Sequence, residues 1–266
     1  MAEIAGKDCQ IKISGVLTTM VGEGTTSVAG NLIYNITDEA KQVLDRTGAI
    51  KVQKKGTDDI SEAGTTSTNI TMTAHGLVTG DLICNLDRSS AYRLVAYVDD
   101  DNVAVASVVG QTTGNDIEVY KTEATADYLI NRLNGRVTYP TATVRVIKIS
   151  GNYYPMSVAA YAKSASDNKN CDILDITKFG NQYKNRLAGL KSASGTVEHI
   201  NVIDDYFKDA LTAGDPIVIE HRTASSNTPD RFWALLESTE MSAAVEGLQS
   251  ETVSWISKNS WISLGE

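Results

Sequence analysis

The sequence has little of what an enzyme or a secreted disulfide protein uses. Its three cysteines, Cys9, Cys84 and Cys171, are odd in number and form no CxxC pair. This disfavours a disulfide framework or a thiolate zinc site and favours reduced thiols. Only 6% of the 266 residues are aromatic, which is few for a deep apolar pocket. No apolar run approaches the roughly 18 residues that span a membrane.

Positive charge is also scarce. The formal net charge is −9 and the pI is about 4.9. A basic surface is the usual mark of nucleic-acid binding, so a general DNA-binding role is disfavoured. The N-terminal MAEIAGKDCQ has neither the basic nor the apolar region of a signal peptide, so we expect none. With 42% hydrophobic residues the chain can still bury a globular core.

The three histidines are not spaced as metal ligands. His75, His199 and His221 occur as HG, EHI and EHR, without the i, i+3 or i, i+4 spacing that places two ligands on one helix face. In a strand, the neighbours Glu198 and His199 point to opposite sides. A metal centre is therefore disfavoured.

Other chemical motifs are missing as well. The sequence contains no G-x-S-x-G, and Cys84 and Cys171 lie in apolar segments where a thiol packs instead of reacting. The glycines of 22–30 precede an expected strand instead of the helix that a phosphate loop requires. The acidic run at 99–102 lacks the glycine and glutamate of a calcium loop and reads as a hairpin turn, although calcium binding stays open. We expect no catalytic residue, cofactor or metal.

Period-two alternation of apolar and polar residues is typical of half-buried strands and dominates the chain. In the segment 142–149, Val144, Val146 and either Ile147 or Ile149 are predicted to face inward. The glycine- and threonine-rich 18–31 and the polar 163–170 are predicted to be loops. Outside the central region the expected strands are 9–17, 49–54, 142–149, 216–222, 231–239 and 248–258.

Two helices are predicted. Thr37 can cap a short helix that runs to about Arg46 and stops at Gly48. The second helix, 202–213, is the clearer one and ends before Gly214. Its apolar stripe at helical spacing consists of Ile203, Tyr206, Phe207, Ala210 and Leu211.

A polar stretch at 56–64 marks the best boundary in the chain. Beyond it, short β segments alternate with turn sequences, which indicates a small sandwich or barrel of its own. We therefore predict one discontinuous domain, 1–61 with 123–266, and an inserted β module at 62–122. The expected strands of the module are 68–74, 81–85, 91–98, 102–109 and 116–120.

The C-terminal half carries a family resemblance. Its segment CDILDITKFGNQYKNRLAGLKSASGTVEHINVIDDYFKDALTAGDPIVIEHR combines two strands, an amphipathic helix and a Gly-Asp turn into a further strand. It resembles the core of the major tail tube proteins of long-tailed bacteriophages, and AVEGLQSETVSWISKNSW is similar to the family's last strand. The earlier GNYYPM, INRLNGRVTY and ITDEAKQVLDRTG also fit. The resemblance covers about 1–55 and 123–266.

The resemblance implies a mostly-β protein: a tail-tube-like sandwich or barrel with one flanking helix, here with the small all-β insertion. In that family six copies form a ring, inner strands join into one barrel, and rings stack into a tube that conducts DNA. The implied partners are further copies and other tail proteins such as the tape measure, tail tip and terminator. Assembly in the bacterial cytoplasm, a place in the virion tail and no membrane anchor are expected.

The acidic composition suggests where DNA would pass. Positive side chains in the lumen would bind phosphates and stall passage, so an acidic or neutral lumen is expected, without specific DNA binding. The candidate lumen-facing residues are Glu198, Glu220, Glu237 and Glu251. The alternative is a carbohydrate-binding or surface-adhesion module, for which exposed aromatic side chains would be platforms. The candidates for such platforms are Tyr153, Tyr154, Trp255 and Trp261.

Overall fold

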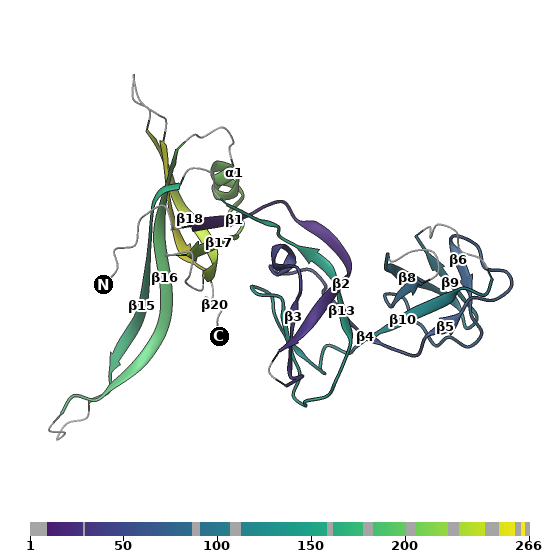
Figure 1. The fold of residues 1–266 in the computed structure, drawn as a ribbon. Helices are drawn as coiled ribbons and strands as arrows, with labels where there is room; N and C mark the ends of the chain where they lie inside the picture. The colour runs from purple at the N-terminus through teal and green to yellow at the C-terminus, as the bar shows by residue number, and fades with distance from the viewer. Residues whose placement is uncertain are drawn as a thin grey trace, which may run out of the picture. The chain divides into compact units, whose positions relative to one another are not determined.

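The chain folds into antiparallel β-sheets with one short α-helix in the part that can be described (Figure 1). The predicted mostly-β fold with a flanking helix is confirmed. Two compact units are present: Met1–Gly15 with Met156–Glu266, and Val16–Pro155. The computed structural model describes residues 10–28, 30–86, 91–106, 113–158, 162–177, 183–200, 206–222, 229–242, 250–258 and 262–263.

The first unit is built on one eight-stranded sheet with the order β14-β1-β17-β18-β19-β16-β15, and with β20 paired to β18. All of its pairings are antiparallel. The strands are β1 (Gln10–Ser14), β14 (Met156–Val158), β15 (Ala162–Asp175), β16 (Arg186–Ile200), β17 (Ile217–Arg222), β18 (Asp230–Ser242), β19 (Ser250–Ser257) and β20 (Ile262–Ser263).

One face of this sheet forms the core of the first unit. Because side chains alternate along a strand, every second residue of β16, β17, β18 and β19 points to this face. Phe232 and Trp255 meet at the centre, with ring centroids 5.0 Å apart. The Trp255 ring lies against Gly195, where a Cβ atom would come within 2.5 Å of it. The buried members are Ala193, Val197, Phe207, Ile217, Ile219, Phe232, Ala234, Val253 and Trp255.

The helix α1 (Tyr206–Ala213) packs on this core. Phe207 is buried in the cluster and Ala210 packs against it, as the predicted stripe requires. Gly214 ends the helix with a positive φ of 68° and donates its N–H to the Ala210 carbonyl. Leu211 is only half-buried. Ile203 and the expected start of the helix lie outside the described residues, as does Cys9.

The sheet curls over its core, because β15 reaches β17 and β18 although it lies at the opposite end of the strand order. A carboxylate oxygen of Asp167 in β15 lies 2.9 Å from the Nδ1 atom of His221 in β17. Lys169 lies 3.7 Å from Asp167 and also pairs with Asp230 of β18. These charged contacts close the open side of the core beside Phe232.

The second unit contains a sheet with the order β11-β12-β3-β2-β13-β4-β10-β7-β8-β9-β6, and with β5 paired to β10. Its strands are β2 (Thr18–Val28), β3 (Ile33–Ile36), β4 (Lys51–Lys55), β5 (Asp59–Ile60), β6 (Asn69–Thr71), β7 (Leu82–Asn85), β8 (Arg93–Asp99), β9 (Asn102–Val105), β10 (Asp116–Thr122), β11 (Leu129–Asn131), β12 (Arg136–Thr138) and β13 (Ile147–Tyr153).

This second unit has two separate cores. One lies among β2, β3, β4, β12 and β13 and is centred on Tyr34, Leu44 and Ile149. The other consists only of residues between Ile70 and Val119, within the predicted module. The five strands predicted for the module are all present as β6 to β10. Tyr120, Lys121 and Thr122 of β10 pair with β4, so the end of the module's last strand joins the sheet that carries the first core.

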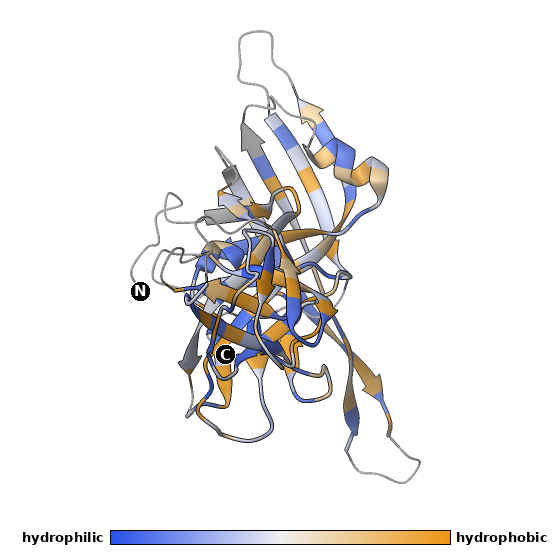
Figure 2. Cartoon of the chain, turned by 90° about the vertical axis from the view of Figure 1, so that its right-hand side faces the viewer, coloured by the Kyte–Doolittle hydropathy of each residue, from blue (hydrophilic) through white to orange (hydrophobic). Residues whose placement is uncertain are grey.

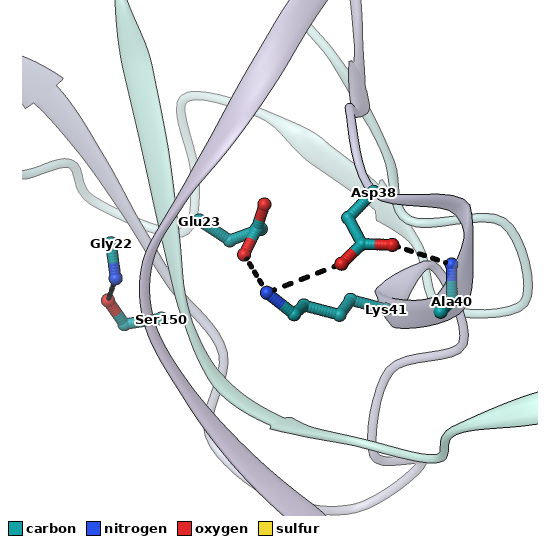
Figure 3. Close-up of polar contacts among 6 residues, drawn as sticks. All are labelled: Gly22, Glu23, Asp38, Ala40, Lys41 and Ser150. Carbon is teal, nitrogen blue, oxygen red and sulfur yellow. Dashed lines mark hydrogen bonds and ion pairs between the residues drawn. The ribbon is translucent and has the colours of Figure 1, made fainter.

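The region predicted as a helix from Thr37 contains only the single 3₁₀ turn η2 (Glu39–Lys41), so that prediction is wrong. Asp38, not Thr37, caps it by accepting the N–H of Ala40 at 3.0 Å, and Lys41 bridges Glu23 and Asp38 (Figure 3). The helix fails because Leu44 gives its backbone N–H to Arg132 and is fully buried as an extended residue. Tertiary packing outweighs a weak local preference.

Three other predictions of local structure are wrong. The expected loop 18–31 contains β2, and the expected loop 163–170 lies within β15. The expected strand 142–149 begins only at Ile147, and both Val144 and Val146 are exposed. Ile147 and Ile149 do point into the core, as predicted. The glycines and hydroxyl residues that suggested loops are instead strand residues whose neighbours on adjacent strands complete the hydrogen bonding.

The second unit is inserted between two paired strands of the first. Ser14 of β1 pairs with Met156 of β14 in the first unit. Thr18 of β2 pairs with Tyr153 of β13 in the second. The chain therefore enters and leaves the second unit on neighbouring antiparallel strands. The boundaries predicted at 61/62 and 122/123 fall inside this unit.

Candidate functional site: a hydroxyl-lined sheet face with free edges

The face of the first sheet that points away from its core is covered by small polar side chains. It spans β15, β16, β19 and the C-terminal part of β18, and we call it the hydroxyl face. Its members in the described strands are Ser164, Ser166, Asn168, Asn170, Ser192, Ser194, Thr196, Glu198, Ser238, Glu240, Ser242, Ser250, Thr252 and Ser254.

Strand register places these side chains in rows across the sheet. Thr196 is the register partner of both Ser166 and Ser254. Ser254 is in turn the register partner of Ser238. Register partners in an antiparallel sheet share a face. Within this row the hydroxyls of Ser166 and Thr196 lie 2.9 Å apart and hydrogen-bond. The row is a short ladder of neutral hydroxyl groups.

The residues between these positions show why the sequence folds this way. Val197, Val253 and Trp255 alternate with the hydroxyl residues and are buried in the core. The central strands β16 and β19 thus carry mainly apolar residues inward and hydroxyl residues outward, the period-two pattern of a sheet with one wet face. The exceptions on the outward side are Ile256, which is partly exposed, and Leu235.

The hydroxyl face carries negative charge and no positive charge among its defined members. Glu198 and Glu240 are both register partners of Thr252, one on each side of it, so the three residues lie in one row. Ser164 donates a hydrogen bond to Glu198 at 3.3 Å. Its described members therefore include no cationic group that could displace counterions from the phosphates of duplex DNA.

The structure places the four candidate lumen residues in different surroundings. Glu198 lies on the hydroxyl face, and Glu237 is exposed at the bulge of β18 between Leu236 and Ser238. Glu220 and Glu251 are 1% and 3% exposed in the single chain. Only the first two therefore present a carboxylate to solvent.

Glu220 belongs to a buried ion row. Its carboxylate accepts from Arg231 Nε at 2.8 Å and lies 3.1 Å from Lys12 Nζ. Burial by itself raises the pKa of Glu220, but the charges and hydrogen bonds of Arg231 and Lys12 outweigh it and hold the pKa below its ordinary value. This carboxylate stays ionised and ties β1, β17 and β18 together.

On both sides, the hydroxyl face ends in a strand edge that has no further partner strand among the described residues; we call these the free edges. β15 pairs only with β16 among the strands of the described chain. On the opposite side, β18 pairs with β17 as far as Ala234, and residues 236–242 have a described strand partner only in β19. A free edge exposes backbone N–H and C=O groups and is a template for pairing with another chain.

The hairpin of β15 and β16 also extends beyond the rest of its sheet (Figure 1). β16 pairs with β19 only from Ser194 onward, so residues 171–176 and 185–191 form a two-stranded ribbon, here called the arm. The arm is the pair of strands at the lower right of Figure 2, where orange marks hydrophobic residues on it. Its apolar side chains are exposed: Ile173, Leu174, Ile176, Leu187 and Leu190.

The other candidate chemical groups are engaged in the fold. His75 accepts the N–H of Leu77 at Nδ1, and its Nε2 contacts the carbonyl of Asp99, so both ring nitrogens have partners. Burial raises the pKa of the Cys84 thiol, which keeps it protonated. Asp99 accepts hydrogen bonds from within its own hairpin turn. Across the described ranges, no group of three or more His, Cys, Asp and Glu side chains could hold a metal ion.

The aromatic platforms of the alternative function lie in different places. Trp255 is 2% exposed and packs in the core of the first unit. Tyr153 and Tyr154 are half-buried, and Trp261 lies outside the described residues. Of the helices that the structure describes, none has the length and apolarity to cross a membrane.

Sequence reasoning missed the hydroxyl face and the arm. The signal for the face was present, because Ser164, Ser166 and Asn168 recur at period two, as do Ser192, Ser194 and Thr196. A small polar residue at every second position indicates a strand, just as an apolar residue at every second position does. The segment 163–170 was interpreted by its polarity alone.

Comparisons with known proteins give a structural likeness only. No protein-family model matches the chain, and no curated protein does. Among solved structures, the chain is similar to one described as the tail of an empty GTA particle with C6 symmetry, at 15% identity and a TM-score of 0.38. That match covers 41% of this chain and 86% of the other. A chain of the virion of a native gene transfer agent (GTA) particle matches at 14% identity, with a TM-score of 0.37 and coverage of 40% and 86%.

Proposed function

We propose that the protein is a structural subunit of a phage-type tail, whose copies join edge to edge into rings that stack as a tube. The observation that carries the proposal is the hydroxyl face between two free strand edges. Pairing β15 of one copy with residues 236–242 of β18 in the next satisfies both edges. The contact is heterologous, so repeated pairing closes a ring or runs on as a filament.

The hydroxyl face becomes the inner wall in this arrangement. Because one face of each four-stranded patch is packed on the core, ring closure leaves the other face toward the lumen or toward the outside. A wall of Ser, Thr and Asn side chains with Glu198 and Glu240 neither binds phosphates nor offers an apolar surface to bases. It therefore suits the passage of duplex DNA, and we assign it to the lumen.

Amide hydrogen exchange on assembled and unassembled protein tests the edge contact. Electron microscopy first establishes whether purified protein forms rings or tubes. In assemblies, the amides of β15 and of residues 236–242 should gain protection, because they exchange solvent for a strand partner. β16 and β19 are the internal control, since each is already paired on both sides over Ser194–His199 of β16 and Glu251–Ile256 of β19. Rings without new protection at either edge would contradict the contact.

The proposal includes six copies per ring and a location in the virion tail. The proposed further partners are the tape measure, tail tip and terminator proteins. Mass measurement of the smallest closed ring tests the copy number directly. A carbohydrate-binding role would instead leave the purified protein monomeric, with affinity for polysaccharide. Trp255 does not support a carbohydrate-binding role, because its ring is buried and cannot stack on a sugar.

The insertion at 62–122 is proposed to be a separable module. Its nine-membered core shares no residue with the first core of the second unit. Tyr92 of the module contacts the rest of the unit, because its ring lies against Gly22 and the Lys148 ammonium lies 4.4 Å from the ring centroid. Replacing 62–119 by a Gly-Ser linker keeps the residues that pair with β4 and should leave a folded protein that assembles. An insoluble product would show that the module is needed by the main core.

A further inference from the structure

The guanidinium of Arg145 is held in one position in the second unit. Its Nη1 donates hydrogen bonds to the carbonyls of Thr141 and Thr143, at 3.2 and 3.1 Å. Its Cζ atom lies 4.0 Å from the centroid of the Tyr139 ring, a cation–π contact. The hydroxyl of Tyr34 fixes the backbone of the same segment, because it donates to the Thr143 carbonyl and accepts the N–H of Arg145. The fold itself therefore positions this guanidinium.

One edge of the guanidinium has no partner. The Nε atom of Arg145 is buried and donates no hydrogen bond. Within the part of the chain that the structure describes, Nη2 donates none either, and no carboxylate forms an ion pair with Arg145. Nε and Nη2 lie on the same edge of the planar group and present two parallel N–H donors, the geometry that binds the two oxygens of a carboxylate. A buried donor without an acceptor is unfavourable, so this edge, here called the open edge, suits an incoming anion.

A small apolar pocket adjoins Tyr139, the residue on which Arg145 stacks. Its volume is about 200 Å³. Sites for whole small molecules have roughly 300–1,000 Å³, so this pocket has room for a single side chain instead. Its walls include Ala126, Leu129 and Pro140. Leu129 is 77% exposed, so this apolar wall is open to solvent.

We propose that Arg145 and the pocket together bind a segment of a partner protein in which a carboxylate side chain lies next to an aliphatic one. The carboxylate binds at the open edge of Arg145, and the aliphatic side chain fills the pocket. Asp127 also lines the pocket, and its negative charge keeps the partner's carboxylate out of it. Glu123 accepts a hydrogen bond from the Tyr139 hydroxyl, so it is held by that group and leaves the open edge free.

A protein segment fits these features better than a free anion does. A free phosphate or carboxylate would use only the guanidinium and would leave the apolar pocket open to water. Arginine and tyrosine are enriched among the residues that contribute most to protein–protein binding, and these residues lie beside well-packed pockets. Arg145, Tyr139 and the pocket all belong to the second unit, so the inference does not depend on the ring proposed for the first unit.

Titration of the unassembled full-length protein with three short peptides, followed by NMR, tests the site. The peptides are acetyl-Leu-Glu-Leu-amide, its neutral analogue acetyl-Leu-Gln-Leu-amide, and acetyl-Ala-Glu-Ala-amide, which lacks the larger aliphatic side chains. The first should bind about tenfold more tightly than the second, because a charged carboxylate accepts both hydrogen bonds of the open edge. It should also bind about threefold or more tightly than the third, because a leucine side chain fills the pocket. Equal affinity for the Glu and Gln peptides, or no binding of any peptide, would overturn the proposal.

Two variants separate the guanidinium from the pocket, and a third is the control. Arg145→Lys keeps the charge but loses the paired donors, so it should remove the preference for the Glu peptide over the Gln peptide. Ala126→Trp fills the pocket from an exposed position and should remove only the preference for leucine over alanine. Arg136 is the control, because its Nε already donates to Asn35, and Arg136→Lys should keep both preferences. A preference for the Glu peptide that survives Arg145→Lys, or one that Arg136→Lys removes, would place the contact elsewhere and overturn the proposal.

Discussion

Replacing Arg231 by Met should destabilise the first unit strongly, because it leaves a buried carboxylate short of its main partner. Glu220 is 1% exposed and Arg231 3% exposed, and their contact is 2.8 Å. Breaking a buried ion pair from one side costs about 3–5 kcal/mol. Lys12 stays 3.1 Å from the carboxylate, so we expect the lower end, about 3 kcal/mol.

The double variant Arg231→Met with Glu220→Met separates the cost of an orphaned charge from the worth of the pair. Replacing a whole buried pair by apolar residues is often neutral or stabilising. We therefore expect the double variant to recover most of the loss and to lie within about 1 kcal/mol of the wild type. A matched Lys12→Met variant, whose side chain is partly exposed, should lose only about 1 kcal/mol.

Tryptophan fluorescence in urea is the assay, because Trp233, Trp255 and Trp261 all belong to the first unit. The pKa of Glu220 is lowered in the fold, so its stabilising contribution is complete above the unfolded pKa of about 4.3. It is lost as pH falls through the folded pKa. The deficit of Arg231→Met should therefore shrink below pH 4.3. Two results would refute the reasoning: a loss of unfolding free energy in Arg231→Met that does not change with pH, or a double variant as unstable as Arg231→Met alone.

Three further outcomes are expected. Thr196→Lys with Ser254→Lys, register partners on the hydroxyl face, should make assembled tubes bind duplex DNA in a salt-sensitive way, and tubes that still ignore DNA would count against a lumen-facing position. Gly195→Ala should lower the free energy of unfolding by about 1–3 kcal/mol, since the new methyl group meets the Trp255 ring. Phe207→Ala should lower the free energy of unfolding by about 3 kcal/mol, because this side chain is buried in the core. Asp209→Ala, on the exposed side of α1, should lower it by less than about 0.5 kcal/mol. Equal unfolding midpoints of the two variants in urea would contradict the packing of the helix.

Sequence patterns predicted those elements whose own residues decide the outcome. The stripe around Phe207 and the stop at Gly214 gave α1, and the turn sequences gave every strand of the module. The helix expected after Thr37 failed because Leu44 is drawn into a core made by residues far along the chain. Sequence periodicity does not contain those distant contacts.

The candidate site was harder to predict for the same reason. Glu198 was named as a candidate because an acidic residue in a strand stands out, but Glu220 has the same appearance in the sequence and is buried with Arg231. Only strand register distinguishes them, since Glu220 lies between Lys12 and Arg231. The arm could not be predicted either, because its length depends on where β19 stops pairing with β16.

The insertion of the second unit between Ser14 and Met156 has a consequence for folding. These two residues are register partners, although the whole of Val16–Pro155 separates them in the chain. Joining them across an unfolded segment of that length would cost about 4 kcal/mol of loop-closure entropy. When the second unit folds first, its own pair of Thr18 and Tyr153 brings the two ends together. The inserted unit then acts as the turn of a hairpin, and the pairing of β1 with β14 in the first unit follows it.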